Sequence, residues 1–456
     1  MADEQAVVHK VLRRLIPFGV LCYLMNYVDR VNISVAKLKM VHDARAHTGL
    51  EWFTEDVYSI GAGIFFLGYF LFELPSNLIM EKVGARRWMA RIMISWGIIT
   101  MCFVFTRGVW SFYGFRFGLG LAEAGFFPGM VLYLSYWMPQ RYRARAAAMF
   151  LTSTALAGVI GNPLGGLITY LTRSQPLGIA DWQWLFLLEG FPSVLLGLVT
   201  LLYLTDRPKD ARWLNADERA TLIAVMKREE ESHPAHGKKA LADALASPHM
   251  WILSLLYGLM IFGFYMVNFY TPTIFKTALT SGGLIGEKTP APVADLWVCL
   301  FSAIPFGAAA VGMVLIGRHS DKHQERKYHL AFACGLIVVG MVVAALGASV
   351  AGSAGTVLVI GGLSVGAMGA FGMFGPFWAL PNQFLTGTAV AAAFAIINSI
   401  GNLLGGYLGP MLKSYLGMQQ VLLLAAGLGA CAMALTLAAP LPRRVAEPEV
   451  EATTAA

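Results

Sequence analysis

Apolar runs of about twenty residues recur along the whole chain, and they constrain its fold more than any other feature. A helix of that length crosses the hydrocarbon core of a bilayer. Runs of this kind lie near residues 15–36, 57–80, 88–106, 109–137, 144–171, 183–204, 249–276, 294–317, 329–349, 354–380, 388–412 and 418–441. The sequence therefore predicts an all-α membrane protein with twelve transmembrane helices.

The composition agrees with a membrane protein. Hydrophobic residues make up 57% of the chain and charged residues only 13%, whereas soluble domains are nearer a quarter charged. The net charge of +7 does not indicate nucleic-acid binding, because the basic residues lie in short loops between apolar runs. The five cysteines lie inside apolar runs without metal-ligand spacing. We expect no metal, no cofactor and no nucleic-acid partner.

Lysine and arginine are more frequent in the loops that lie on the same side of the membrane as the amino terminus than in the loops on the opposite side. Basic loops stay in the cytoplasm, so both termini are predicted to be cytoplasmic. The charged lead at residues 1–14 is followed by a run of full span length without a small-residue cleavage site. We therefore expect a retained first helix.

An internal repeat divides the chain into two pseudo-symmetric six-helix bundles. The string GNPLGG at 161–166 recurs as GNLLGG at 401–406, and Glu81 followed by lysine recurs as Asp321 followed by lysine at the same offset of 240 residues. Parallel repeats of this kind are typical of major-facilitator-type transporters. The predicted units are an amino-terminal bundle (1–204), a linker (205–247), a carboxy-terminal bundle (248–441) and a disordered cytoplasmic tail (442–456).

The linker contains the pattern of a helix start. Asn215 and Glu218 have the spacing of a capping box, and residues 216–231 then read as a helix with Leu222, Ile223 and Met226 on one side. We expect a cytoplasmic surface helix that joins the bundles. A regulatory partner site is the alternative.

Ionisable residues inside the predicted spans are concentrated in the first bundle. They are Asp29, Arg30, Glu73, Arg116, Glu123 and Glu189. A charge in a span costs roughly 2.5 to 3.5 kcal/mol on insertion scales, so such residues usually face a cavity or the bundle interior. Since the second-bundle spans contain essentially none beyond their ends, we expect the first bundle to bind the charge and the second to add polar and aromatic contacts.

Helical geometry separates the roles of these charges. Tyr27 and Arg30 share one face, while Asp29 points about 100° away from Arg30. Arg116 and Glu123 are seven residues apart, which places them on one face about 10 Å apart. We therefore expect a cross-helix network of Asp29, Arg30, Arg116 and Glu123.

Two interpretations of this network stay open. The charges could neutralise one another and lock the helices, although buried ion pairs are weak stabilisers. Alternatively, guanidinium groups bind a carboxylate and buried acids load and release a proton. Glu73 has either a packing or a site role, and Glu189 is expected to pair with a neighbouring helix. The second-bundle candidates for lining the cavity are Tyr265, Asn268, Trp378, Asn398, Ser399 and Asn402.

Several strings carry a family resemblance. They are NYVDRVNI at 26–33, FELPSN at 72–77, GLGLAEAGFFPG at 118–129 and WLFLLEG at 184–190. The chain resembles the anion:cation symporter family of the major facilitator superfamily. It looks most like the bacterial branch that imports organic acids, which includes tartrate, phthalate, hydroxyphenylacetate and nicotinate transporters.

The resemblance implies roles for individual residues. The substrate-binding positions it implies are Tyr27, Arg30, Tyr69, Arg116 and Asn398, with Trp378 near an aromatic contact. The proton-coupling acids it implies are Asp29 and Glu123. The loop motif corresponds to Glu81, Arg86, Arg87, Asp321 and Arg326, with glutamate at 81 where the superfamily usually has aspartate. Thr154 stands where sugar-acid members have glutamine, which disfavours a sugar acid.

These observations together predict a proton-coupled symporter, active as a monomer in the bacterial inner membrane. It would import a small organic anion by alternating access, either a mono- or dicarboxylate such as tartrate or an aromatic acid. An exporter of anionic metabolites or drugs is one alternative, and a membrane receptor that binds a carboxylate without transporting it is another. The sequence contains no nucleophile triad or phosphate loop that would indicate an enzyme.

Overall fold

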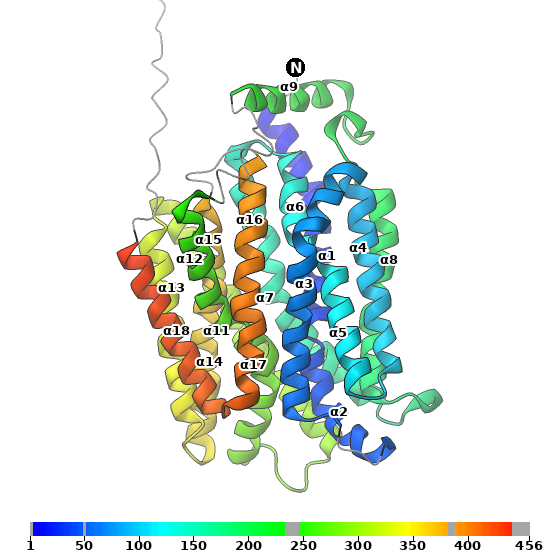
Figure 1. Cartoon of the computed structure of the whole chain (residues 1–456), viewed down its shortest axis with the longest axis vertical. Coiled ribbons are helices and arrows are strands. Elements are labelled where there is room, and N and C mark those ends of the chain that lie inside the picture. Colours follow the sequence, from blue (N-terminus) through cyan, green and yellow to red (C-terminus); the bar gives the residue numbers. More distant parts are fainter. Residues whose placement is uncertain (1–2, 49–51, 233–245, 382–387, 440–456) are drawn as a thin grey trace, which may run out of the picture.

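The computed structural model describes residues 3–48, 52–232, 246–381 and 388–439. Over these ranges the chain is helical and contains no strand. Most helices run roughly parallel in one elongated body, with the amino terminus and α9 at one end and α2 at the other (Figure 1). We call these the α9 end and the α2 end. The predicted tail at 442–456 lies outside the described residues.

The amino-terminal elements are α1 (Glu4–Val31), α2 (Ile33–Thr48), α3 (Glu55–Val83), α4 (Ala85–Cys102), η1 (Phe103–Phe105), α5 (Val109–Glu123), α6 (Phe126–Ser135), α7 (Gln140–Leu171), η2 (Pro176–Gly178), α8 (Asp181–Tyr203), η3 (Pro208–Asp210) and α9 (Ala216–Ser232). The carboxy-terminal elements are α11 (Pro248–Ser281), α12 (Ala291–His323), α13 (Lys327–Gly347), α14 (Gly352–Gly372), α15 (Phe374–Ala379), α16 (Thr388–Gly401), η5 (Asn402–Tyr407), α17 (Leu408–Tyr415) and α18 (Met418–Ala438).

Ten helical stretches among the described residues are long and apolar enough to cross a membrane. They match ten of the twelve predicted spans. The other two predicted spans correspond to α1 and to the run α16, η5 and α17, in which the π-helix η5 divides the stretch into shorter pieces. With these two, the chain forms twelve spans in two six-helix bundles.

Breaks inside the spans fall next to the polar residues of the first bundle. The first span continues beyond its predicted end, with a break at Asn32 between α1 and α2. The fourth span breaks at Gly125, whose φ of 86° is left-handed. Glycine adopts this conformation without a Cβ penalty, so α5 ends at Glu123 and α6 begins at Phe126. The break therefore sets the position of Glu123 at a helix end inside the protein.

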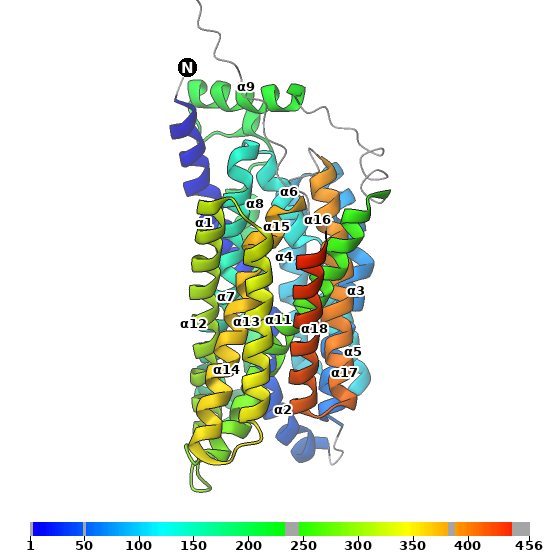
Figure 2. The ribbon, with the colours of Figure 1, turned by 90° about the vertical axis from the view of Figure 1, so that its left-hand side faces the viewer.

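The two bundles meet along a few helix pairs. In the first bundle α3 packs on α5, and α4 on α8; in the second α13 packs on α14 and α18. Between the bundles α7 packs on α12, α3 on η5 and α17, and α11 on α2. Figure 2, turned by 90°, shows the second-bundle helices α12, α13, α14 and α18 in front. The exact domain limits remain a prediction.

The linker helix α9 forms as predicted and lies across the end of α1 (Figure 1). Asn215 and Glu218 make both hydrogen bonds of the capping box, at 2.9 and 2.8 Å. Leu222 is buried, but Ile223 is 39% exposed. The prediction that Ile223 lies on the same apolar side as Leu222 was therefore wrong. The Lys10 ammonium bonds to the Glu218 carboxylate at 2.7 Å and lowers the pKa of Glu218. This ion pair attaches α9 to α1.

Close packing of α5 on α3 yields a stability prediction. A methyl group at Gly120 would press on the Phe65 carbonyl and lie 3.0 Å from the Tyr69 nitrogen, whereas one at Gly114, also in α5, meets nothing within 4 Å. We expect Gly120→Ala to destabilise the protein by about 1–3 kcal/mol through overpacking. Thermal denaturation in detergent should show a lower midpoint for Gly120→Ala and little change for Gly114→Ala. Equal midpoints for both variants would contradict this account of the α3–α5 contact.

Candidate functional site

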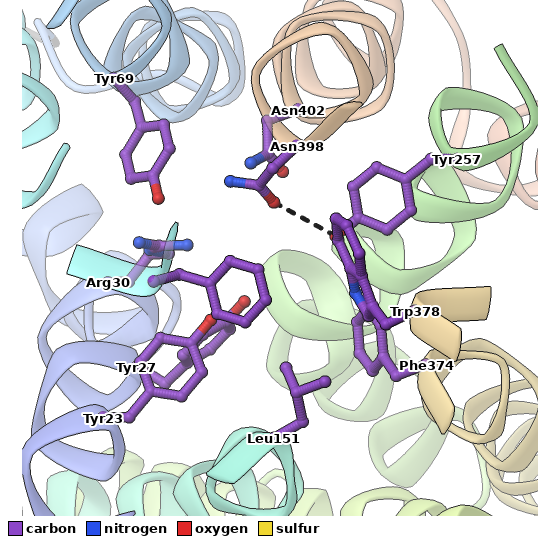
Figure 3. Close-up of a pocket in the computed structure, with 11 residues that line it drawn as sticks. Tyr23, Tyr27, Arg30, Tyr69, Leu151, Tyr257, Phe374, Trp378, Asn398 and Asn402 are labelled. Atoms are coloured by element: carbon purple, nitrogen blue, oxygen red, sulfur yellow. Dashed lines mark hydrogen bonds between the residues drawn. The ribbon is translucent and has the colours of Figure 1, made fainter. Parts of the chain in front are cut away.

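A small cavity lies between the bundles (Figure 3). The free space inside it is about 10 Å³, about enough for one water molecule. Its wall is formed by Tyr23, Tyr27, Arg30, Tyr69, Phe127, Leu151, Tyr257, Phe374, Trp378, Asn398 and Asn402. Five predicted substrate-binding residues are therefore brought together here from both bundles. Arg30 is the charged residue of this wall.

Arg30 is held by an ion pair with Glu123. The guanidinium donates from Nε and Nη2 to one carboxylate oxygen, Oε2, at 3.0 and 2.8 Å. Asn26 donates to the same oxygen at 2.9 Å and accepts from Arg30 at 3.3 Å. Glu123 is fully buried and Arg30 is 3% exposed. The pair thus positions a cation at the cavity wall.

Aromatic rings surround the rest of the guanidinium. The rings of Tyr27, Phe65 and Tyr69 lie 4.8, 5.1 and 5.2 Å from its central carbon. Such rings attract a cation through their negative faces. In Figure 3 Arg30 lies between Tyr69 and Tyr27 on the first-bundle side of the cavity. The arrangement keeps Arg30 charged and facing a largely desolvated space.

Asp29 points away from this cavity, although it is the neighbour of Arg30 in the sequence. Its Oδ2 accepts from Trp96 of α4 at 3.0 Å and from Ser193 of α8 at 2.5 Å. The two adjacent charges therefore have different partners, as their angular separation on the helix predicted. Asp29 does not line the cavity.

Two predicted site residues lie elsewhere. The Nε of Arg116 donates to the Gly61 carbonyl of α3 at 3.1 Å, and Asn268 donates to the Phe264 carbonyl of its own helix at 2.7 Å. Neither residue lines the cavity. The expected four-charge network forms in part: Glu123 forms an ion pair with Arg30 and is close enough to Arg116 for their charges to interact, but Arg116 makes its hydrogen bond to α3. Spacing along one helix did not reveal which neighbour that face would meet.

Glu73, for which the sequence allowed either a packing or a site role, bonds to the second bundle. Its Oε1 accepts from the Asn398 amide at 2.6 Å, and its Oε2 accepts from the Ser399 hydroxyl. Glu73 belongs to α3 and its two donors to α16, so these bonds join the bundles beside the cavity. The sequence signal was a carboxylate inside an apolar span, but its distant partners were not deducible from spacing.

The loop-motif residues lie near the α9 end. The Arg86 backbone amide donates to Asp206 at 2.8 Å, and Arg326 pairs with Asp321 at 2.6 Å. Glu81 and Arg87 are exposed. Among the described residues, Arg86 therefore bonds to the linker and Arg326 bonds within its own bundle.

At the α2 end, a set of polar contacts joins the bundles. The contacts are Lys37 to Thr273 at 3.0 Å, Lys39 to Asp295 at 2.9 Å, Tyr58 to the Phe269 carbonyl at 2.6 Å and Ser59 to Tyr270 at 3.0 Å. Each links α2 or α3 with α11 or α12. The cavity is therefore closed toward the α2 end in this structure.

A polar, mostly buried cavity between two repeated helix bundles is the architecture of a membrane transporter. Residues 19–410 match the Major Facilitator Superfamily. The chain belongs to this superfamily, and its members are transporters rather than enzymes.

Several known proteins of similar sequence are bacterial transporters. A putative tartrate transporter of Agrobacterium vitis is 43% identical over 91% of this chain and 88% of its own length. A quinolone resistance transporter of Acinetobacter baumannii is 37% identical over 91% of each chain. Among solved structures, an inward-facing bacterial homolog of the human lysosomal transporter Spinster superposes with a TM-score of 0.68 at 16% identity, covering 95% of this chain and 97% of its own. That likeness concerns the fold alone.

The contact between Lys39 and Asp295 yields a conformational prediction. Both side chains are at most 10% exposed. Lys39 also lies 3.7 Å from Asp181 of its own bundle, so loss of the Asp295 carboxylate removes its attraction to the second bundle. We expect Asp295→Asn to shift the balance toward opening at the α2 end by about tenfold, which corresponds to about 1.4 kcal/mol.

Distances between spin labels at Ser174 and Thr280, exposed positions near the α2 end of the two bundles, would measure this shift. Glu287→Gln removes a carboxylate from the exposed α11–α12 connection and serves as the control. Identical distance distributions in the wild type and Asp295→Asn would show that this ion pair does not hold the α2 end closed.

Proposed function

We propose that this protein is a proton-coupled symporter that imports a small organic anion by alternating access. The observation that carries the proposal is the Arg30–Glu123 pair at the wall of a cavity between the bundles. A guanidinium is the side chain best suited to a carboxylate. Here its partner is an internal carboxylate, with which the substrate would compete.

Protonation of Glu123 is the proposed link between proton and substrate. A neutral Glu123 no longer competes for the Arg30 Nε and Nη2 donors, so a substrate carboxylate takes them. Loss of that proton on the other side of the membrane restores the internal pair and expels the anion. Asp29 is proposed as a second coupling acid that acts through the contacts of α1 with Trp96 and Ser193.

We place the protein in a bacterial inner membrane with both termini in the cytoplasm. The α9 end then faces the cytoplasm and the closed α2 end faces outward. The monomer contains the complete cavity, and the proposed unit of transport is one chain.

The substrate class follows from the wall of the cavity. Arg30 supplies one cationic end, while Asn398 and Asn402 supply amides from the second bundle. The similarity to a putative tartrate transporter supports a small carboxylate. The similarity to a quinolone resistance transporter keeps export of an anionic drug as the second candidate, and the rings of Tyr257, Phe374 and Trp378 would suit a planar substrate.

Uptake into proteoliposomes tests the proposed function. With an inward proton gradient, purified protein should accumulate labelled tartrate, or another small carboxylate from a panel, above the level reached without the gradient. Arg30→Lys keeps the charge but loses the planar fork, so we expect a loss of binding of at least about tenfold. Carboxylate uptake that is indifferent to the gradient would refute proton coupling. Binding without accumulation would indicate a receptor, and gradient-driven efflux of a fluoroquinolone from cells would favour the exporter.

A Glu123→Gln variant tests the role of the acid. The substituted side chain has the shape of glutamate but cannot gain or lose a proton, so we expect proton-driven uptake to fall by about tenfold or more while exchange of internal for external substrate is retained. Paired uptake and counterflow assays measure the two activities. Equal losses in both assays would show that Glu123 has a packing role.

A further inference from the structure

Glu73 is the one buried carboxylate among the described residues that joins the two bundles beside the substrate cavity. It is fully buried, with no exposed surface. No lysine or arginine in the described part of the chain forms an ion pair with it. Its oxygens accept from the neutral Asn398 and Ser399 instead. A buried carboxylate that relies on neutral donors is costly, so its position needs an explanation beyond packing.

Asn398 connects Glu73 with the cavity. Its amide nitrogen donates to Glu73 at 2.6 Å, while its carbonyl oxygen lies 3.5 Å from the Tyr257 hydroxyl. In Figure 3 the amide nitrogen points toward the side of Tyr69, and Asn402 lies beside it. A cavity residue thus commits its donor group to a carboxylate of the protein itself. The amide has two N–H groups, and a substrate carboxylate competes with Glu73 for the one that Glu73 accepts.

The opposite side of the cavity has the same arrangement. There the Arg30 donors are occupied by Glu123. Internal carboxylates therefore bond to both polar ends of the cavity, one from α5 and one from α3. An anion with two carboxylates is the ligand that replaces both.

We infer that Glu73 is a surrogate for a substrate carboxylate in the empty transporter, and that the cavity takes a dicarboxylate whose second carboxylate displaces it from Asn398 and Ser399. Glu73 then takes up a proton, which adds one to the protons cotransported with each substrate. This inference rests on the proposed function. It adds a coupling residue that neither the sequence pattern nor the family resemblance assigned.

The groups around Glu73 are compatible with this exchange. Arg30 of α1 is the cation that acts on it, Tyr69 of α3 and Tyr257 of α11 face it with neutral hydroxyls, and α16 offers only neutral donors. A proton on Glu73 turns one oxygen into a donor, which weakens its hold on Asn398 and Ser399. Release of this contact also removes the two hydrogen bonds that join α3 to α16 beside the cavity.

The inference is tested by measuring how many charges cross the membrane with each substrate molecule. Wild-type protein and Glu73→Gln in proteoliposomes would be compared for L-tartrate uptake at imposed membrane potentials. The glutamine side chain fills the same space as glutamate. We expect Glu73→Gln to carry one proton fewer per tartrate, seen as a shift of the reversal potential, and to bind tartrate about tenfold more tightly at pH 8 because a competing charge is lost. Glu73→Asp should restore the wild-type proton number, and the exposed Glu287→Gln should match the wild type.

The outcomes separate this inference from the proposed function. If the wild type shows no gradient-driven uptake of any carboxylate, the proposed function itself is wrong. If the wild type takes up tartrate but Glu73→Gln has the same reversal potential, Glu73 is not a coupling group. A wild type that transports glycerate, which has a single carboxylate, as well as tartrate would overturn the dicarboxylate assignment. Thermal midpoints of the variants verify that each is folded.

Discussion

The buried ion pair between Arg30 and Glu123 is the interaction on which the arrangement of the site depends. Removing one member of such a pair typically costs about 3–5 kcal/mol, because the other charge is left uncompensated. The pair therefore fixes α1 against the end of α5. The left-handed Gly125 places that helix end inside the bundle, and Tyr27, Phe65 and Tyr69 enclose the guanidinium. The cavity forms where this cluster faces the second bundle.

The bundle interface combines two kinds of contact. At the α2 end, Lys37 and Lys39 bond to Thr273 and Asp295, and Tyr58 and Ser59 bond to α11. Beside the cavity, Glu73 bonds to neutral donors of α16. A few polar contacts of this kind, each worth little net free energy, allow two arrangements to lie within a few kcal/mol of one another. Alternating access requires such a balance, since a ligand shifts an equilibrium only by its differential affinity for the two states.

Fold and site contribute different parts of the functional argument. The fold establishes a transporter of the major facilitator superfamily, but one fold hosts many substrates. The chemistry of the cavity narrows the class, because a cationic end at Arg30 and amides on the opposite wall fit a small anion better than a cationic drug. The bacterial relatives include both a putative tartrate transporter and a quinolone resistance transporter, so transport assays are needed to distinguish these substrates.

The class of fold, the spans and the position of most helices could be predicted from the sequence alone. Apolar run length and loop charge are local properties that the bilayer converts directly into structure. The capping box of α9 and the separation of Asp29 from Arg30 were likewise predictable, because each depends on helix geometry over a few residues. Five of the seven predicted substrate-binding residues were also brought to the cavity.

The helix faces that contact one another could not be predicted in this way. The tertiary structure paired Arg30 with Glu123 rather than with Asp29, turned Arg116 toward Gly61, left Asn268 inside its own helix, and joined Glu73 to Asn398 across 325 residues of sequence. These contacts depend on the packing of helices distant in the sequence and on breaks such as Gly125. Helical periodicity defines the face on which a residue lies, but the neighbour of that face is set by the whole bundle.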